Sequence, residues 1–430
     1  MDMEIISSAV NVLWLFFGGI LVFFMQAGFA MVETGFTRAK NAGNIIMKNC
    51  VDFMLGSIVY WFIGFGLMYG TTVGGVIGVP FGQFFMNSSA FEPTMDYATL
   101  FFQTVFCATT ATIVSGSMAE RTNFKAYVMY SFLISLFIYP IAGHWVWSSD
   151  GWLAKLGFHD FAGSGIVHSM GGTLAFVGAA ILGPRIGKYK IVNGKKESTA
   201  IPGHNIVIGA LGVFILWFGW FGFNPASTLS LIDSSAPADS QPYMLAAKVF
   251  ITTNLAACAA AASAMFFTWK RYGKPDVSMT LNGVLAGLVA ITAPCDCVSP
   301  LSAVIIGLVA GIIVTLAVEL IDTKLHVDDP VGAVAVHGCC GIWGVIAVGI
   351  FANDHELEGL ITGHFQQFGV QLLGAVALVA WSALMGFIIF TIMNKAGFLR
   401  AKKEEELAGL DVTEHGLPSA YADFMPAYKD

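Results

Sequence analysis

Long apolar segments recur along almost the whole of this 430-residue chain, with short polar breaks between them. A helix that crosses a bilayer needs about 20 mostly apolar residues, and eleven such segments can be counted. Charged residues make up only 11% of the chain, against about 25% in an ordinary soluble domain. The expected spans are residues 9 to 33, 43 to 70, 99 to 118, 124 to 142, 164 to 183, 201 to 223, 243 to 270, 279 to 295, 301 to 322, 331 to 352 and 366 to 395. The sequence therefore predicts an all-α, multi-pass membrane protein.

The positions of lysine and arginine predict the orientation, because cytoplasmic loops are enriched in both. The breaks after the odd-numbered spans, together with the tail, hold Arg38, Lys40, Lys48, Arg121, Lys125, Arg185, Lys188, Lys190, Lys195, Lys196, Lys270, Arg271, Lys274, Lys324, Lys395, Arg400, Lys402, Lys403 and Lys429. Only Lys155 and Lys248 lie elsewhere. We expect a protein of the cell (inner or plasma) membrane with its N-terminus outside and its C-terminus in the cytoplasm.

Two parts are expected along the chain, a membrane domain at residues 1–395 and a polar cytoplasmic tail at residues 396–430 that would be regulatory. Within the membrane domain, the fifth and tenth spans resemble each other. When His168 is aligned with His337, Asp160 falls on Asp329. Two halves of five spans begin on opposite sides of the membrane, so helices 1–5 and 6–10 are predicted to form an inverted repeat. In such repeats the solute site lies at the interface between the halves.

His168 and His337 are the two histidines well inside apolar spans. Ionisable groups inside a membrane are costly and usually functional. A neutral imidazole offers one donor and one acceptor, so a pair that shares a proton would present hydrogen-bonding edges to a small polar solute. The alternative is a pair of buried histidines bonded to the backbone.

Aromatic residues gather near the outer ends of several spans, among them Phe102, Phe106, Trp147, Trp220 and Phe223. A tryptophan ring is the best aromatic face for a cation. Single rings at this depth are also typical of the aromatic belt that anchors a protein in lipid. Composition alone favours lipid anchoring over a cation site.

Carboxylates stand at two kinds of position. Asp160 and Asp329 precede the fifth and tenth spans, where a carboxylate is suited to capping a helix N-terminus. For Asp160 a second role, holding backbone carbonyls toward a cation, stays open. Lys48 and Asp52, four residues apart near the cytoplasmic end of the second span, are predicted to form an ion pair.

Neither a cofactor, a metal ion nor a catalytic centre is predicted. Cys295 and Cys297 lie near an outer loop without a partner cysteine or histidine at metal-site spacing, so we interpret them as buried apolar residues. No zinc-protease, nucleophile-elbow or Walker pattern is present. An enzyme and a nucleic-acid-binding protein are both disfavoured.

Six segments resemble the ammonium transporters of the Amt, Mep and Rh superfamily. They are FFQTVFCATTATIVSGSMAER (101 to 121), HWVWSSDGWL (144 to 153), DFAGSGIVHSMGG (160 to 172), GWFGFNPAS (219 to 227), VDDPVGAVAVHGCCG (327 to 341) and GLDVTEHG (409 to 416). The motifs stand in family order and cover nearly the whole chain, so it is similar to an Amt-type bacterial or archaeal member.

This resemblance implies a homotrimer of eleven-helix protomers, each with its own pore. By matching motif, Trp147 and Ser227 would bind NH4+ in an outer vestibule, and Phe102 would complete an aromatic cage. The residue chemistry suits this role, because ring faces and one hydroxyl replace part of the hydration of a small cation.

Further along the implied pore, Phe106 and Phe223 would stack as a gate below the vestibule. His168 and His337 would line an apolar conduit, and Trp220 would pack beside the gate. Moving a charge through a dry pore is costly whereas neutral NH3 crosses easily, so deprotonation below the vestibule is expected to select against potassium. A separate proton relay through the histidines and Asp160 stays open.

The tail motif resembles the segment through which bacterial members meet PII-type (GlnK) regulators, although a tail that only packs on neighbouring protomers is the alternative. Two rival functions remain. An Rh-type gas channel is expected to lack the vestibule tryptophan, so Trp147 argues against it. A sensor that binds ammonium with little flux and signals through a cytoplasmic partner is the rival from another class.

Overall fold

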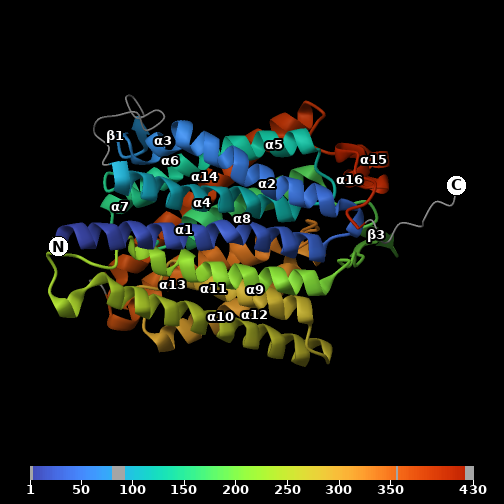
Figure 1. Cartoon of the computed structure of the whole chain (residues 1–430). Helices are drawn as coiled ribbons and strands as arrows, with labels where there is room; N and C mark the ends of the chain where they lie inside the picture. The colour runs from blue at the N-terminus through green and yellow to red at the C-terminus, as the bar shows by residue number, and fades with distance from the viewer. Residues whose placement is uncertain (1–2, 80–92, 355–356, 422–430) are drawn as a thin grey trace.

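A bundle of long helices that run along one common axis forms the molecule (Figure 1). The computed structural model describes residues 3–79, 93–354 and 357–421. Among these described residues, ten helical segments are long and apolar enough to cross a membrane. They are Met3–Phe36, Ala39–Tyr69, Met95–Met118, Phe124–Lys155, Ser164–Leu182, Ile206–Thr228, Ala238–Tyr272, Pro300–Thr323, Val334–Phe351 and Phe365–Lys395. The expected eighth span is the shorter apolar helix Val277–Ile291, so all eleven expected segments are helical.

The elements follow one another with short connections. The α-helices are α1 (Met3–Phe36), α2 (Ala42–Val59), α3 (Phe65–Tyr69), α4 (Pro93–Met118), α5 (Phe124–Leu133), α6 (Tyr139–Trp147), α7 (Trp152–Lys155), α8 (Met170–Leu182), α9 (Ile206–Phe223), α10 (Pro242–Tyr272), α11 (Val277–Ile291), α12 (Pro300–Thr323), α13 (Cys340–Phe351), α14 (Phe365–Lys395), α15 (Lys403–Ala408) and α16 (Leu410–His415). Wider π-helical turns form η2 (Tyr60–Gly64), η4 (Ile134–Ile138), η5 (Ser164–Ser169) and η8 (Val334–Cys339). Short 3-10 turns form η1 (Ala39–Asn41), η6 (Pro225–Thr228), η7 (Ala238–Ser240) and η9 (Leu360–Thr362).

In the part of the chain that the structure describes, three small antiparallel hairpins lie in the connections outside the spans. They are β1 (Thr71–Val73) with β2 (Ile77–Val79), β3 (Tyr189–Val192) with β4 (Lys195–Ser198), and β5 (Asn353–Asp354) with β6 (Leu357–Glu358). The spans themselves are entirely helical, as hydrocarbon requires, because a helix satisfies its own backbone hydrogen bonds.

Polar side chains start several of the spans by accepting backbone N–H groups that the first turn leaves free. Asn205 Oδ1 accepts from Val207 N and Ile208 N at the start of α9. Asp276 begins α11 and Ser299 begins α12 in the same way. These caps set where each apolar segment enters the helical conformation.

Small residues let neighbouring helices approach at backbone distance. A methyl group built on Gly307 of α12 would lie 2.3 Å from the carbonyl oxygen of Ala256 in α10. A methyl group on Gly287 of α11 would meet the same oxygen at 2.4 Å. Close packing of α10, α11 and α12 therefore depends on these two glycines.

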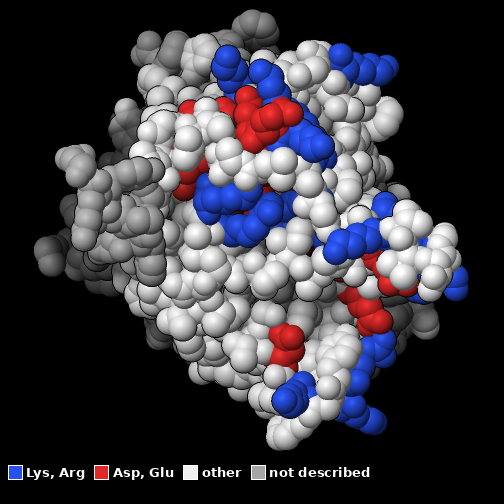
Figure 2. Space-filling model, turned by 90° about the vertical axis from the view of Figure 1, so that its right-hand side faces the viewer, with Lys and Arg blue, Asp and Glu red and all other residues white. Residues whose placement is uncertain are grey.

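The charged side chains at one end of the bundle agree with the expected orientation. The N-terminus lies at one end and the described tail helices α15 and α16 at the other (Figure 1). Lysine, arginine and acidic side chains gather on the tail end (Figure 2). We therefore place the tail end in the cytoplasm and the N-terminus outside.

A buried ion-pair cluster lies at this cytoplasmic end. Arg185 contacts Asp328 at 2.8 Å and Glu120 at 2.9 Å. Burial by itself raises the pKa of Asp328, but Arg185 and Arg121 lower it to about 2. The cluster ties the break after the fifth span to the residues that precede the tenth.

The tail packs on the same end of the bundle. Asp411 in α16 accepts hydrogen bonds from Gly43 N at 3.0 Å and Asn44 N at 2.7 Å. The Glu406 carboxylate of α15 is buried and contacts Arg400 at 2.7 Å. The described part of the tail is thus held against the cytoplasmic mouth of the bundle.

Candidate functional site

An outer cavity of about 160 Å³ lies near the non-cytoplasmic end of the bundle. Its lining residues are Tyr69, Thr99, Phe102, Gln103, Phe106, Trp147, Phe161, Ser227 and Leu229. The three residues predicted to bind a cation, Trp147, Ser227 and Phe102, therefore meet in one cavity. Trp147 Nε1 donates to the backbone oxygen of Asp160 at 2.8 Å, which fixes the plane of the indole ring.

A pair of stacked phenylalanines forms the floor of this cavity. The rings of Phe106 and Phe223 are 4.0 Å apart between centroids, with an angle of 29° between their planes. Both side chains are buried, and Phe102 packs on Phe106 from above at 4.7 Å. The two rings are in direct stacking contact with each other.

The two histidines lie directly below the phenylalanine pair and face each other. Their Nδ1 atoms are 3.2 Å apart, and the His168 ring lies 5.5 Å from the ring of Phe223. Trp220 stacks on His168 at 5.1 Å and donates its Nε1–H to Thr292 Oγ1 at 2.9 Å. The sequence prediction that the repeat brings both histidines together is confirmed.

The hydrogen-bonding edges of the histidine pair are set by the contact between the two rings. When both rings are neutral, a hydrogen bond between the two Nδ1 atoms uses one proton, so one Nε2 is a donor and the other an acceptor. His168 Nε2 is buried and has no hydrogen-bond partner among the described residues. His168 Nε2 is therefore not bonded to the backbone, contrary to the alternative interpretation of a backbone-bonded pair.

Matching turns in the two halves hold the histidines in place. Asp160 accepts backbone N–H groups of Gly163, Gly165 and Ile166 at 2.9 to 3.1 Å. Asp329 does the same for residues 333 and 334 in the other half. Both carboxylates cap the helices that bear the histidines, as predicted. Burial raises the pKa of Asp160 to about 6, although these N–H bonds act in the opposite direction.

The two histidine helices also cross at backbone distance. A methyl group built on Gly172 would lie 2.1 Å from the backbone nitrogen of Gly338, the residue after His337. No side chain fits at Gly172 without separating the helices. This crossing, together with the two caps, explains why residues 169 positions apart in the chain meet at 3.2 Å.

Two further cavities lie on the cytoplasmic side of the histidines. A small one of about 20 Å³ is lined by His337, Glu33, Asn282 and ten mainly apolar residues. A larger one of about 400 Å³ shares Asn282 and Val331 with it and lies beside residues 201 to 203. The outer cavity, the stacked phenylalanines, the histidines and these inner cavities follow one another along the protein.

One sequence prediction was wrong and one residue was missed. Lys48 does not pair with Asp52, whose carboxylate accepts hydrogen bonds from Tyr127 and from Ser131, the latter at 2.6 Å. Lys48 instead lies 4.0 Å from Glu33 of the first span. Spacing along one helix could not anticipate a partner on another helix. Glu33 itself was detectable, because it is an acidic residue inside a predicted span.

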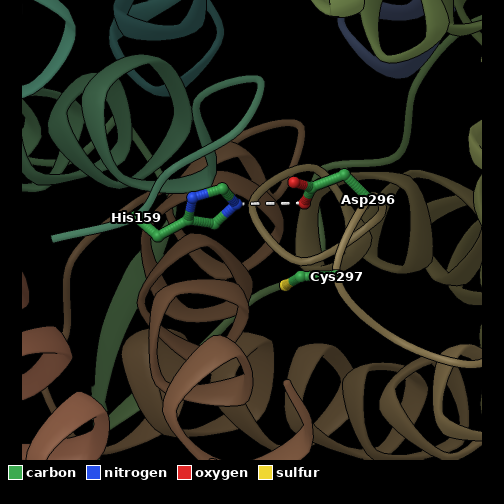
Figure 3. A group of neighbouring side chains, drawn as sticks. All are labelled: His159, Asp296 and Cys297. Atoms are coloured by element: carbon green, nitrogen blue, oxygen red, sulfur yellow. Dashed lines mark hydrogen bonds and ion pairs between the residues drawn. The ribbon is translucent and has the colours of Figure 1, made fainter. Parts of the chain in front are cut away.

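A group of potential metal ligands lies near the outer side, where His159 approaches Asp296 and Cys297 (Figure 3). His159 comes from a distant part of the chain, so spacing around the cysteines did not predict it. His159 Nε2 and Asp296 Oδ1 form an ion pair at 3.0 Å, and Cys297 Sγ donates to Pro294 O at 3.5 Å. Burial lowers the pKa of His159, but the carboxylate of Asp296 more than offsets it. We therefore assign the group as an internal ion pair beside a thiol.

Comparison with known proteins agrees with this arrangement. A family model described as the Ammonium Transporter Family matches residues 13–420. The chain belongs to this family. It is 46% identical over 434 residues to ammonium transporter Amt2 of Archaeoglobus fulgidus, covering 97% of this chain and 89% of the relative. It is 38% identical to ammonium transporter 1 member 2 of Arabidopsis thaliana, covering 92% of this chain and 79% of that one.

Solved structures of the family share the fold. A protein named Sensor Amt Protein matches with a TM-score of 0.88 at 41% identity, over 96% of this chain and 100% of the other. Mep2 of Candida albicans matches with a TM-score of 0.82 at 27% identity, over 94% and 89%. The chain is thus a multi-pass membrane protein of the ammonium transporter family and not an enzyme.

Proposed function

We propose that this ammonium transporter family member recruits NH4+ in the outer cavity, removes a proton from it below the cavity and conducts NH3 past the twin histidines. The observation that supports this most strongly is the direct contact between His168 and His337, with an unpartnered buried nitrogen between an outer and an inner cavity. A nitrogen without a protein partner in a dry passage provides a hydrogen bond for a small polar solute.

The outer site suits a small cation with hydrogen-bond donors. Trp147, Phe102 and Phe106 present ring faces to the cavity, and Ser227 contributes a hydroxyl whose own proton is donated to Phe223 O at 2.9 Å. The hydroxyl oxygen is therefore left as an acceptor for an N–H of ammonium. Aromatic faces stabilise a desolvated cation by about 1 to 2 kcal/mol each.

Below the outer site the passage favours a neutral solute. The rings of Phe106, Phe223 and Trp220 lie at the entry to the histidines, and they offer an ion no hydrogen-bond acceptor in place of its water. An ion pays a large desolvation cost there. NH4+ avoids this cost by leaving a proton behind, whereas potassium has none to lose. The proton either returns outside or follows by a relay through the histidine pair and Asp160.

Solid-supported-membrane recording tests this proposal. We would reconstitute the protein in liposomes, apply jumps of ammonium and of potassium, and compare the wild type with His168→Ala. A saturable current for ammonium but not potassium, lost in the variant, supports conduction with net charge. A rise of internal pH without current supports passage of neutral NH3 and removes the relay. Neither signal above protein-free liposomes would contradict transport.

A sensor with little flux is the second candidate, because the chain is 41% identical to a protein named Sensor Amt Protein. Both functions need the outer site. They differ in flux, so saturable ammonium binding without any flux above protein-free liposomes would favour the sensor. The two cavities on the cytoplasmic side of the histidines favour the transporter, since a sensor does not need a continuous passage.

Assembly and regulation are part of the proposal. A homotrimer follows from the family resemblance, and mass measurement of the purified protein in detergent tests it. The tail beyond residue 395 would bind a PII-type (GlnK) regulator at the cytoplasmic face, because α15 and α16 lie at the cytoplasmic mouth. Pull-down of a PII protein should be lost when the chain ends at Gly397. Equal capture by both chains would contradict a role for the tail.

A further inference from the structure

The small inner cavity contains a carboxylate that the conduction proposal does not use. Glu33 is on α1 and is 2% exposed, yet it lines the same cavity of about 20 Å³ as His337. A space of this size holds about one water-sized molecule. The cavity therefore has room for a single ammonia, ammonium ion or water directly after the histidines.

Both oxygens of Glu33 are oriented by neighbouring side chains. Ser115 Oγ donates to Oε2 at 2.7 Å, and Asn49 Nδ2 approaches Oε1 at 3.4 Å. An ionised carboxylate accepts about four hydrogen bonds, so each oxygen retains capacity toward the cavity. Gly116 also lines the cavity, and a methyl group built on it would lie 2.6 Å from Val331 Cγ2, so no larger residue fits there without a shift.

A second acceptor faces the same space. Asn282 on α11 is 6% exposed, and its Oδ1 is buried without a hydrogen-bond partner among the described residues. Its amide nitrogen contacts Val331 O at 3.5 Å on the other side. Leaving a buried acceptor unpaired costs about 1 to 3 kcal/mol, so a hydrogen-bond donor in the cavity is favoured. The ring of Phe29 adds an aromatic face.

Glu33 is the acidic residue among those that line this cavity. Lys48 Nζ lies 4.0 Å from Glu33 Oε2, beyond hydrogen-bond distance, and Lys48 is not part of the cavity lining. Asp52 is also absent from the lining, because its carboxylate accepts hydrogen bonds from Tyr127 and Ser131. A cation in the cavity would therefore contact the carboxylate of Glu33.

We propose that this cavity is an inner ammonium site, where NH4+ donates hydrogen bonds to the Glu33 carboxylate and to Asn282 Oδ1. The inference rests on the proposed conduction of ammonia, since it describes where the substrate is held on the cytoplasmic side of the histidines. Ammonium fits better than potassium, because the acceptors are few and directional and the cation has four N–H donors to share among them. NH3 that has passed the histidines becomes NH4+ by taking a proton from cytoplasmic water that enters through the larger cavity sharing Asn282, and the ion leaves through the same cavity.

Transport measured separately from each side tests the inner site. Proteoliposomes are sorted by capture on a C-terminal affinity tag, so that the tail faces outward in one population and inward in the other. We expect Glu33→Gln to raise the half-saturating ammonium concentration on the tail side by about tenfold or more, since it removes a charged hydrogen-bond acceptor. The value for the opposite side should change less than about twofold.

Three further variants complete the experiment. Glu33→Asp keeps the charge, so its half-saturating ammonium concentration on the tail side should stay close to that of the wild type. Asn282→Leu changes no charge and should raise this concentration several-fold. Glu319→Gln serves as the matched control, because it removes a carboxylate that pairs with Arg271 on the cytoplasmic surface. Glu319→Gln should leave the half-saturating ammonium concentrations on both sides within about twofold of the wild type.

The outcomes separate the inner site from the conduction proposal. If the wild type transports ammonium but Glu33→Gln leaves the tail-side value unchanged, or shifts both sides equally, the inner site is wrong while conduction stands. If Glu33→Gln does not fold, an unchanged value for Asn282→Leu overturns the site just as well. If the wild type moves no ammonium from either side, conduction fails and the inner site fails with it.

Discussion

Replacing Asp160 with alanine removes the acceptor that holds the start of the helix bearing His168. Three backbone N–H groups lose their partner, those of Gly163, Gly165 and Ile166. Gly163 has a left-handed backbone with φ of 109°, so the turn before the helix has no regular hydrogen bonding to fall back on. We expect the variant to be less stable and to lose ammonium transport, because His168 is five residues beyond this turn.

The expected loss of unfolding free energy is the difference between two opposing effects. Each unsatisfied buried N–H costs about 2 kcal/mol, so three cost about 6 kcal/mol. The variant also relieves the burial of a charge. Burial raises the pKa of Asp160 from 3.8 to about 6, which is worth about 3 kcal/mol of destabilisation at neutral pH. The net loss at pH 7.5 is about 3 kcal/mol.

The raised pKa of Asp160 also makes the stability difference between the wild type and Asp160→Ala depend on pH, in a direction that can be predicted. Because the pKa is higher in the folded state, Asp160 contributes stability that is fully present below pH 3.8 and is lost as the pH rises through about 6. The wild type therefore gains stability from pH 7.5 to pH 5, by about 1 kcal/mol from this group. Asp160→Ala lacks the carboxyl group and cannot gain this stability. The difference in unfolding free energy between the two proteins should therefore increase on acidification.

Denaturant unfolding in detergent micelles at pH 7.5 and pH 5 measures both effects, with transport recorded in liposomes. Asp160→Asn is the matched control, since it keeps one acceptor oxygen and removes the ionisable group. It should lose less stability than alanine and show no gain on acidification from this position. Equal stability of Asp160→Ala and wild type, or a gap that narrows at pH 5, would refute the assignment of Asp160 as the cap.

Two other positions give equally specific expectations. Asp328→Asn should cost about 3 kcal/mol in unfolding free energy at neutral pH, because Arg185 loses its main partner while keeping Glu120. The pKa of Asp328 is lowered to about 2, so the wild type should lose this stability as the pH falls from about 4 to 2. If the unfolding free energy of Asp328→Asn fell with pH in the same way as that of the wild type, the pairing would be contradicted. Gly172→Ala should destabilise the protein by more than about 3 kcal/mol, since the added methyl would lie 2.1 Å from Gly338 N. Gly369→Ala is its control, because nothing lies within 4 Å of that position; equal melting temperatures of the two variants in size-exclusion assays would refute the close crossing.

Much of the fold was predictable because the bilayer imposes a simple rule. A span needs an uninterrupted apolar segment, and all eleven segments expected from composition are helical in the structure. The internal similarity around His168 and His337 predicted their contact, since a repeat places equivalent residues at the shared interface. The caps at Asp160 and Asp329 were predictable from their place just before a span.

The contacts that sequence reasoning could not anticipate all join side chains from different helices. Lys48 pairs with Glu33 across two spans and not with Asp52 on its own helix. His159 reaches Asp296 over a separation of 137 residues. Neither partner can be read from spacing, because periodicity identifies the face of a helix and not what packs against it.

Uptake of 15N-labelled ammonium into proteoliposomes tests the central claim most directly, that the substrate passes the histidine contact. Wild-type protein is compared with His168→Phe, which keeps the ring and removes both ring nitrogens, and with empty liposomes. The account predicts saturable uptake by the wild type and uptake no faster than in empty liposomes for the variant, with both proteins equally folded by size-exclusion chromatography. Uptake by His168→Phe at the wild-type rate would contradict the account.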